Sequence, residues 1–337
     1  MQKIISPKIK AVGLISGGLD SALAAKIVKD LGVEVYGVYF SMPWGCCDKT
    51  KAMEAALNLG IHFITLQLDE RYLEVVKKPK YGYGTALNPC VDCRIHMFSR
   101  AADYMRQIEA DFVFTGEVLG QRQMSQLKHS MKWIEEGTSL QGRLLRPLCA
   151  QLLDPTIPEK EGLIDREKLL KISGRSRKEQ LELAQKFEIK DFSPPAGGCL
   201  LTDHNFANRM KDTFKHGYRN FRETIALKWG RHFRLNEHFK IIVGRDEEEN
   251  ISLTRYAHRD DHIMQFAGEQ LGPTLVLKGY NPPLDILETA AGFIQRFSKF
   301  KDQAPQQIKY RPAADKNEIK FVTARILREE EMERMKI

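Results

Sequence analysis

The stretch Ala11–Ser21, AVGLISGGLDS, predicts the fold at the centre of this chain. Its apolar beginning, residues 11–15, has the composition of a strand buried in a parallel sheet. Residues 16–18 carry almost no side chain. After them, apolar residues recur every four positions, as on one face of a helix, at Leu19, Leu23, Ile27 and Leu31. A helix that starts after a glycine turn offers free N–H groups and the positive end of its dipole, so the stretch predicts a binding site for phosphate or pyrophosphate.

The turn does not fit three better-known glycine motifs. No lysine follows Gly17 or Gly18 at the Walker A spacing, and the turn does not read G-x-G-x-x-G. A nucleophile elbow needs glycine where Leu14 stands. The hexapeptide SGGLDS instead resembles the PP-loop of the ATP pyrophosphatases, which cleave ATP between the α and β phosphates. The alternative is that its serines only cap the helix. The resemblance implies binding of ATP with Mg²⁺ by Ser16, Gly17, Gly18, Leu19, Asp20 and Ser21.

Length and composition limit the class of protein. A chain of 337 residues predicts two domains, and its 42% of hydrophobic residues suits globular cores. The net charge of +8 favours polyanionic partners such as nucleic acid. No window is apolar enough for a membrane span, and the first residues lack the apolar region of a signal peptide, so we expect a cytoplasmic protein with no membrane partner. Six cysteines in such a chain are expected to be reduced thiols.

Strands and helices alternate through the first half of the chain. This rhythm predicts an α/β fold over residues 1–205, a Rossmann-like parallel sheet of the PP-loop (adenine nucleotide alpha hydrolase-like) type. Residues 206–337 are expected to form a smaller, basic α+β domain. In the first domain we expect strands at 11–15, 33–40, 62–68, 111–115 and 144–148, and helices at 52–59 and 95–108. In the second we expect strands at 239–243, 251–256, 261–266 and 274–278, a solvated hairpin turn at 244–250 and a helix at 284–297.

A second glycine turn, Gly116–Gln121, follows the strand expected at 111–115. Ligands of parallel sheets bind at the carboxyl ends of the strands, where the two turns would meet. We therefore expect Gly116, Glu117 and Gln121 to belong to the ATP site. Glu117 and Gln121 would bind the ATP-bound Mg²⁺ or the base, and helix capping is the alternative.

The six cysteines of the chain all lie outside the two glycine turns. Cys90 and Cys93 form a C-x-x-C pair in a segment rich in glycine and proline, which predicts a loop, and Cys199 follows a second such segment. From the residues alone, the pair is a redox pair, half a zinc site, a pair of cluster ligands or inert. Vicinal Cys46 and Cys47 are expected mainly as small buried hydrophobes.

Basic residues concentrate between residues 209 and 234, a segment that contains eight Lys or Arg and two acidic residues. Aromatic residues interleave with them. Basic side chains neutralise phosphates and aromatic rings stack on unpaired bases, so the segment predicts RNA binding. The alternative is an amphipathic element with aromatics in the core and charges in solvent. The predicted RNA-binding residues are Lys215, Arg219, Arg222, Lys228, Arg231 and Arg234.

In chain order, the motifs SGGLDS, NPCVDC, TGEVLGQ and GGCL resemble those of PP-loop tRNA thiolation enzymes across the first domain. The turn Gly116–Gln121 resembles the G-E-S-L-G-Q turn of tRNA 4-thiouridine synthetases, with Val118 in place of serine. The cysteine placement resembles that of the 2-thiouridine synthetases. From residue 239 onward, the chain resembles an RNA-binding domain of the NFACT type. The resemblance implies tRNA as the partner and leaves open whether the product is 4-thiouridine or 2-thiouridine.

The resemblance also implies a reaction. ATP adenylates a uridine carbonyl oxygen, with Asp20 among the catalytic residues, and sulfur then replaces that oxygen as AMP leaves. Cys90, Cys93 and Cys199 would hold a [4Fe-4S] cluster with one open iron, which we favour over a persulfide and resolving pair made by Cys93 and Cys199. The sulfur donor would be sulfide or a persulfide carrier such as a cysteine desulfurase, and a homodimer is left open. Two other functions remain: an amide-forming PP-loop ligase and a non-catalytic RNA-binding protein.

Overall fold

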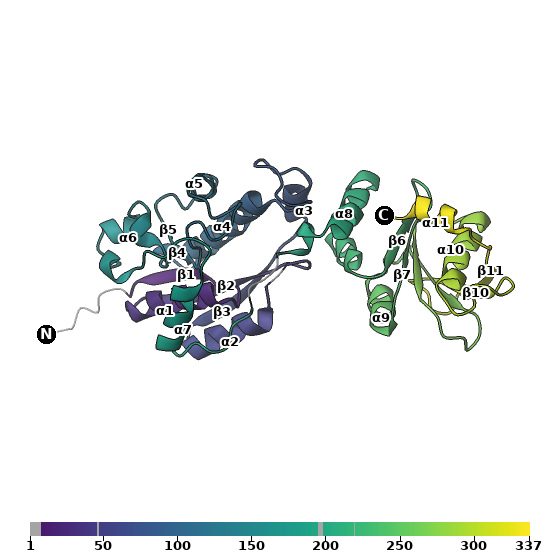
Figure 1. Cartoon of the computed structure of the whole chain (residues 1–337), viewed down its shortest axis with the longest axis horizontal. Helices are drawn as coiled ribbons and strands as arrows, with labels where there is room; N and C mark the ends of the chain where they lie inside the picture. The colour runs from purple at the N-terminus through teal and green to yellow at the C-terminus, as the bar shows by residue number, and fades with distance from the viewer. Residues whose placement is uncertain (1–7, 46, 195–197, 219) are drawn as a thin grey trace. The chain divides into compact units, whose positions relative to one another are not determined.

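The computed structural model describes residues 8–45, 47–194, 198–218 and 220–337. The chain divides into two compact units, Met1–Thr202 and Asp203–Ile337, and each is described by itself (Figure 1). The boundary expected from the sequence lay after residue 205. No helix of the described residues is long and apolar enough to cross a bilayer.

The first unit is built on a parallel sheet of five strands in the order β3-β2-β1-β4-β5. This confirms the predicted α/β class with a parallel sheet. Because β1 is the central strand, the PP-loop that follows it lies in the middle of the carboxyl edge. The strands are β1 Lys10–Leu14, β2 Glu34–Ser41, β3 His62–Gln67, β4 Phe112–Thr115 and β5 Leu144–Leu145. The helices are α1 Leu19–Asp30, α2 Lys49–Leu59, α3 Glu70–Lys77, α4 Cys90–Gln107, α5 Lys128–Glu136, α6 Ile157–Lys160 and α7 Lys178–Lys186, with 3-10 turns at Ala150–Leu152, Arg166–Lys168 and Leu200–Thr202.

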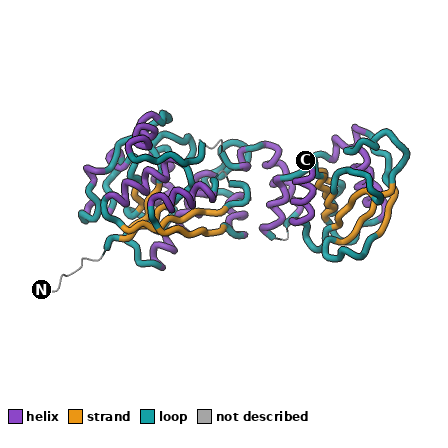
Figure 2. The backbone as a smooth tube through the Cα atoms, turned by 90° about the horizontal axis from the view of Figure 1, so that it is seen from below, coloured by secondary structure: helices purple, strands orange, loops and turns teal. Residues whose placement is uncertain are grey.

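Helices cover both faces of this sheet (Figure 2). Ala11 and Val12 are both fully buried but lie in different cores, because successive strand residues point to opposite faces. On one side, Ala11 shares a core with Leu23 of α1 and Ala184 of α7. On the other, Val12 shares a core with Phe98 of α4. Burial on both faces explains why the strand at the start of the chain is apolar without alternation.

The second unit is an antiparallel sheet of six strands in the order β11-β10-β8-β9-β7-β6, which confirms the predicted α+β class. One face packs on α10 and α11, through Phe293 and Met332. The other face packs on α9 and η4, through Leu253 and Ala226. The strands are β6 Arg231–Arg234, β7 Lys240–Val243, β8 His262–Phe266, β9 Leu275–Lys278, β10 Gln307–Pro312 and β11 Lys320–Thr323. The helices are α8 His204–His216, η4 Phe221–Lys228, α9 Glu247–Tyr256, α10 Leu284–Arg296 and α11 Glu329–Met335.

The structure corrects two local predictions. The strand and hairpin turn expected across 244–256 are wrong, because α9 occupies this segment. Asp246 caps α9 by accepting a hydrogen bond from the N–H of Glu249 (2.9 Å), and three glutamates in the first turn favour a helix N-terminus. The loop expected around the C-x-x-C pair is also wrong, because α4 begins at Cys90, directly after Pro89. Acidic residues and proline are common in turns, but in these two segments they stand at the start of a helix.

Candidate active site

The PP-loop forms a backbone cradle between β1 and α1. Gly17 has a φ of +82°, which glycine adopts without strain, and a Cβ there would lie only 2.8 Å from the backbone nitrogen of Ala52. Ser21 closes the turn, since its Oγ donates to the carbonyl of Gly18 (2.8 Å) and lies 3.2 Å from Ser16 Oγ. Gly18 is the N-cap of α1 and brings no side chain to cap the first N–H groups. These N–H groups are therefore open to a phosphate.

The second glycine turn packs directly onto the PP-loop. A Cβ on Gly116 would lie 2.4 Å from the backbone carbonyl of Asp20 and 2.6 Å from the nitrogen of Ser21, so only glycine fits there. Leu19 is fully buried in the core, so it can contribute only its backbone to a ligand site. The two predicted turns are thus in contact, as their positions at neighbouring strand ends implied.

Asp20, Gln121 and Gln180 form a chain of hydrogen bonds. Gln121 Nε2 donates to Asp20 Oδ2 (2.8 Å), and Gln180 Nε2 donates to Gln121 Oε1 (3.3 Å). Asp20 Oδ1 is buried and has no hydrogen-bond partner among the described residues. Burial raises the pKa of Asp20, opposed by the Gln121 hydrogen bond and by Arg177 and Arg122. An unpartnered buried carboxylate oxygen beside a phosphate cradle fits a divalent cation carried by the phosphates.

The segment 173–193 borders both turns, which the sequence did not predict. Ser173 forms a bridge with Leu119 of the second turn, and the N–H of Ser193 donates to the carbonyl of Gly17 (2.9 Å). Arg177 Nε and Ser193 Oγ are buried without hydrogen-bond partners among the described residues. The one signal for this segment in the sequence was the basic start of α7, and it gave no position relative to the PP-loop.

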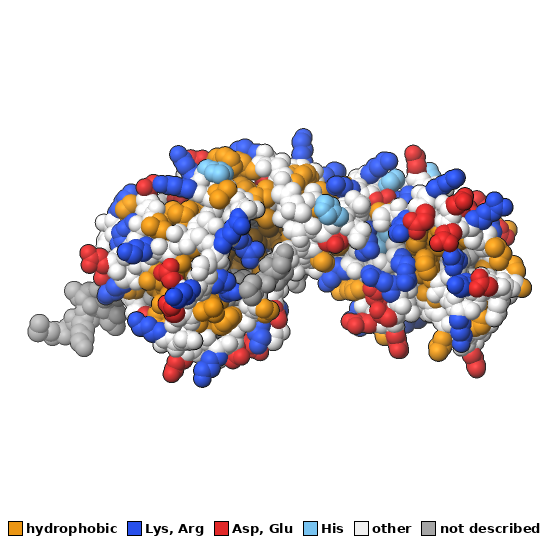
Figure 3. All heavy atoms as spheres, viewed as in Figure 1, with side chains coloured by type: hydrophobic (Ala, Val, Ile, Leu, Met, Phe, Trp, Pro, Cys, Tyr) orange, Lys and Arg blue, Asp and Glu red, His pale blue; other side chains and the backbone are white. Residues whose placement is uncertain are grey.

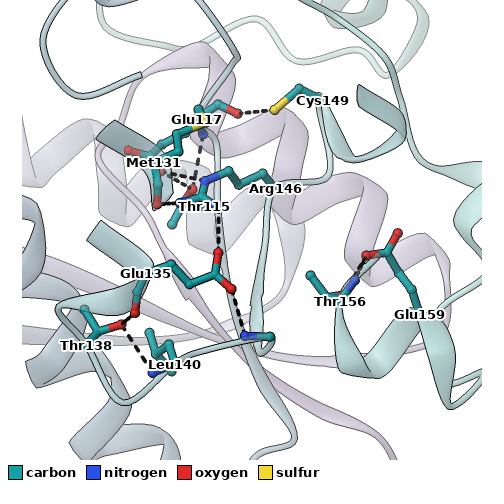
Figure 4. Close-up of polar contacts among 11 residues, drawn as sticks. Thr115, Glu117, Met131, Glu135, Thr138, Leu140, Arg146, Cys149, Thr156 and Glu159 are labelled. Carbon is teal, nitrogen blue, oxygen red and sulfur yellow. Dashed lines mark hydrogen bonds and ion pairs between the residues drawn. The ribbon is translucent and has the colours of Figure 1, made fainter. Parts of the chain in front are cut away.

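Glu117 belongs to a buried ion-pair network (Figure 4). Its Oε2 lies 3.1 Å from Arg146 Nε, and its Oε1 lies 3.4 Å from Arg94 Nε. Arg146 also lies 3.5 Å from Glu135, and the Cys149 thiol donates to the Glu117 carbonyl (3.4 Å). Two guanidinium groups therefore pair with the Glu117 carboxylate, while its Oε1 is buried with no hydrogen-bond partner among the described residues, and the ligand role expected for Glu117 stays a prediction.

Arg146→Met is expected to lower the free energy of unfolding of the protein by about 3 kcal/mol, because it leaves the Glu117 carboxylate buried with one partner fewer. Urea unfolding followed by fluorescence measures this. Lys132→Gln is the control, because Lys132 pairs with Glu136 in solvent at 3.8 Å, and it should cost under about 0.5 kcal/mol. The double variant Glu117→Gln, Arg146→Met should regain part of the loss. Equal stability of Arg146→Met and wild type would contradict the importance of the pair.

Cys90 and Cys93 lie one turn apart at the start of α4. The Tyr72 hydroxyl donates to Cys93 Sγ (3.1 Å), and Asn88 Nδ2 donates to Cys90 Sγ (3.2 Å). Tyr72 is fully enclosed, with 1% of its surface exposed. Burial raises the pKa of Cys93 to about 12, although the Tyr72 hydrogen bond opposes the rise. Nothing local in the sequence predicted the contact between Tyr72 and Cys93.

Cys199 lies near this pair. The N–H of Leu87, just before α4, donates to the carbonyl of Leu201 (3.0 Å), which joins the two cysteine-bearing segments. The thiols of Cys90 and Cys199 both raise the pKa of Cys93, as neighbouring thiolates would. The structure thus brings Cys199 close to a cysteine pair that is far from it in the sequence.

The cluster predicted on the three thiols gains no support from the described residues. Within the described residues, no three His, Cys, Asp or Glu side chains are placed to hold a metal ion. No step is therefore assigned to an iron–sulfur cluster. Cys46 lies outside the described residues. Cys47 is exposed, so the expectation that it is a buried hydrophobe is wrong, because it lies in the loop after β2.

The raised pKa of Cys93 predicts slow alkylation. At pH 8, about four units below that pKa, roughly one thiol in ten thousand is ionised, so iodoacetamide should modify exposed Cys47 first. The rate at Cys93 should rise about tenfold per pH unit between pH 8 and pH 10. Tyr72→Phe should slow it further, because the phenol stabilises the thiolate. Peptide mass spectrometry measures each site, and equal rates for Cys93 and Cys47 at pH 8 would contradict the prediction.

The residues predicted to bind RNA have different environments in the second unit. Arg234 forms a bidentate pair with Asp212, with Nε–Oδ1 and Nη2–Oδ2 distances of 3.0 and 2.7 Å, and the RNA role expected for it stays a prediction. Arg219 lies outside the described residues. On the face shown in Figure 3, basic and acidic side chains of this unit are mixed. Three of the predicted residues are exposed: Lys215, Arg222 and Lys228.

This geometry defines an α/β unit with a PP-loop and, after it in the chain, an α+β unit. Residues 9–148 match the family described as tRNA methyl transferase HUP domain, and residues 230–335 match the family described as NFACT protein RNA binding domain. The chain therefore carries a HUP domain of the PP-loop type and a C-terminal NFACT RNA-binding domain.

Curated relatives are similar to part of this chain. A tRNA-specific 2-thiouridylase MnmA of Beutenbergia cavernae is 34% identical over 125 residues, which cover 32% of this chain and 33% of the relative. The corresponding protein of Clostridioides difficile is 27% identical over 229 residues, covering 62% and 59%. A solved 4-thiouridine synthetase–RNA complex with bound ATP is 22% identical, with a TM-score of 0.40, covering 60% of this chain and 49% of that one. The chain spans about a third of the length of the first curated relatives it matches. The similarity is to tRNA thiolation proteins, and the activity of the whole chain is a proposal.

Proposed function

We propose that this protein is an ATP-dependent tRNA sulfurtransferase that converts a uridine of tRNA to thiouridine. The observation that carries the proposal is the presence, in one unit, of an open PP-loop beside Asp20 and of Cys93 close to Cys199. The PP-loop beside Asp20 suits the binding of ATP, and the two neighbouring thiols suit the transfer of sulfur. The NFACT domain supports RNA as the partner.

Adenylation comes first. The N–H groups at the start of α1 would hold the phosphates of ATP, and Asp20 Oδ1 would hold Mg²⁺, which would neutralise charge on the phosphates. The uridine carbonyl oxygen bonds to the α phosphorus as the bond to pyrophosphate breaks. Gln121 holds the Asp20 carboxylate in place. Positioning and charge neutralisation supply most of the acceleration.

Sulfur transfer follows. Cys93 and Cys199 are both partly buried, but burial raises the pKa of Cys93 and disfavours its thiolate, so Cys199 is the better acceptor of sulfur from a carrier. The terminal sulfur of a Cys199 persulfide bonds to the activated carbon, and AMP leaves. The Cys93 thiolate then attacks Cys199 Sγ, breaks its bond to the transferred sulfur and releases thiouridine. The resulting Cys93–Cys199 disulfide needs an external thiol for reduction.

The test uses purified protein with ATP, Mg²⁺, unmodified tRNA, dithiothreitol, and cysteine with a cysteine desulfurase as the sulfur donor. Nucleosides are separated and identified by mass spectrometry, which also distinguishes 4-thiouridine from 2-thiouridine by retention. We expect thiouridine, AMP and pyrophosphate in equal amounts. Pyrophosphate release that depends on ammonia and a carboxylate, with no thionucleoside, would establish the amide-forming ligase instead.

A further inference from the structure

The second unit contains a cavity of about 370 Å³ between β6, α8, α10 and α11. This is within the range of small-ligand pockets. Its lining combines cationic, aromatic and histidine side chains, of which only Arg231 was predicted from the sequence to bind RNA. The lining residues used below are Arg209, Arg231, His232, Arg296, Phe297 and Lys336.

His232 provides a hydrogen-bond acceptor in this lining. The side chain is 2% exposed, and its Nε2 lies 2.7 Å from the carbonyl of Trp229, so Nε2 carries the proton and donates. Nδ1 then holds a lone pair, and it is buried with no partner among the described residues. Burial lowers the pKa of His232 well below its usual range, which keeps the ring neutral. A ligand that satisfies Nδ1 must present an N–H or O–H donor.

The guanidinium groups of the lining provide positive charge and hydrogen-bond donors, whereas His232 provides an acceptor. Arg231 lies over the ring of Phe297 at 4.7 Å, which orients its guanidinium plane, and Arg209 Nε is buried without a partner among the described residues. Among the described residues, Arg296 and Lys336 form ion pairs with the largely exposed carboxylates of Glu329 (3.5 Å) and Glu333 (3.1 Å). Pairs of this kind are weak and exchange readily for a better anion. The lining therefore suits a ligand with one anionic group and one hydrogen-bond donor.

We propose that this cavity binds a single unpaired nucleotide of RNA, with its phosphate on the arginines and a base N–H or ribose O–H on His232 Nδ1. Unpaired nucleotides can leave the stack and enter such pockets, whereas paired ones cannot. Arginine and aromatic faces also suit base stacking. The inference rests on the proposed function in one respect, that the partner is RNA. Beyond that function, it specifies that this cavity holds the RNA strand and that unpaired nucleotides are selected over paired ones.

The experiment measures binding of a fluorescent single-stranded RNA octamer to the full chain by anisotropy. Arg231→Gln and Arg296→Gln should each weaken binding about tenfold, the loss of one charge-assisted contact. Arg334→Gln is the matched control, because Arg334 is an exposed residue of α11 outside the cavity lining, and it should weaken binding under about threefold. In parallel, 5-iodouridine RNA is photo-crosslinked, and crosslinks are expected on peptides that contain Phe233 or Phe297.

Each other outcome overturns the inference. If RNA binds but the two cavity variants match Arg334→Gln, the cavity is not the RNA site, and RNA remains the partner. If crosslinks fall only elsewhere in the chain, the same conclusion holds. If uridine monophosphate binds as tightly as the octamer, with the same loss in Arg231→Gln, the cavity is a free-nucleotide site. Absence of RNA binding by the wild type would overturn the RNA partner as well, whereas the thiouridine assay tests the first unit independently.

Discussion

Cys199→Ser is expected to abolish thiouridine formation while ATP-dependent release of pyrophosphate continues. In the proposed reaction, adenylation uses the PP-loop and Asp20, which is held by Gln121. Sulfur transfer, in contrast, needs a thiol that can carry a persulfide, and the serine hydroxyl cannot form one. The expected loss of thiouridine is more than about a thousandfold, the scale seen when a covalent nucleophile is removed. Nucleoside mass spectrometry and a pyrophosphate assay on the same reaction measure the two steps separately.

Cys93→Ser should behave differently. Without the resolving thiol, transferred sulfur stays bonded to both the tRNA and Cys199, so a covalent protein–tRNA adduct should accumulate and be released by dithiothreitol. Denaturing gels with and without reductant detect it. Cys47→Ser is the matched control, because Cys47 is an exposed cysteine of the same unit, and it should keep full activity. Full thiouridine formation by Cys93→Ser without reductant would overturn the resolving role.

Asp20→Asn is expected to lower the rate of adenylation by about 10²- to 10³-fold, the effect of removing one preorganised electrostatic group. The amide keeps the size of the side chain but removes the charge beside the phosphate cradle, where Oδ1 has no other partner among the described residues. Pyrophosphate release at saturating tRNA measures the step. Binding of RNA should not change, because it is attributed to the other unit.

Asp30→Asn provides the control for this variant. Asp30 ends the same helix, and its carboxylate pairs with Lys26 on the surface at 2.6 Å. The change is chemically identical and should leave adenylation within about twofold of wild type, because exposed i,i+4 pairs contribute little. If Asp20→Asn and Asp30→Asn retain the same rate, Asp20 has no role in the phosphate site.

The parallel-sheet fold and the position of the phosphate cradle followed from local patterns. A strand, a glycine turn and a helix are each specified by residues that are close in sequence, and the period of the apolar residues identifies them. The PP-loop lies where SGGLDS predicted, because the conformation of Gly17 and the cap at Gly18 depend on their immediate neighbours. Both motif-bearing turns could therefore be located without a structure.

Partners far apart in the sequence could not be predicted this way. The sequence did not indicate that Glu117 pairs with Arg146, which lies 29 positions away. Nor did it indicate that Asp212 of α8 pairs with Arg234. The contact between Tyr72 and Cys93 likewise exists only because α3 packs beside α4.

The sequence by itself determined the class of fold, the glycine turns and the residue types available for chemistry. Only the tertiary structure decided which charges are already neutralised, which polar atoms are left without partners and which cysteines meet. The physical reason is that backbone conformation is set mainly by neighbouring residues, whereas burial, ion pairing and pKa depend on side chains that folding brings together from distant positions. Asp20 Oδ1 and His232 Nδ1 show the consequence: both are buried atoms left without a partner among the described residues, and neither could be recognised before the fold was known.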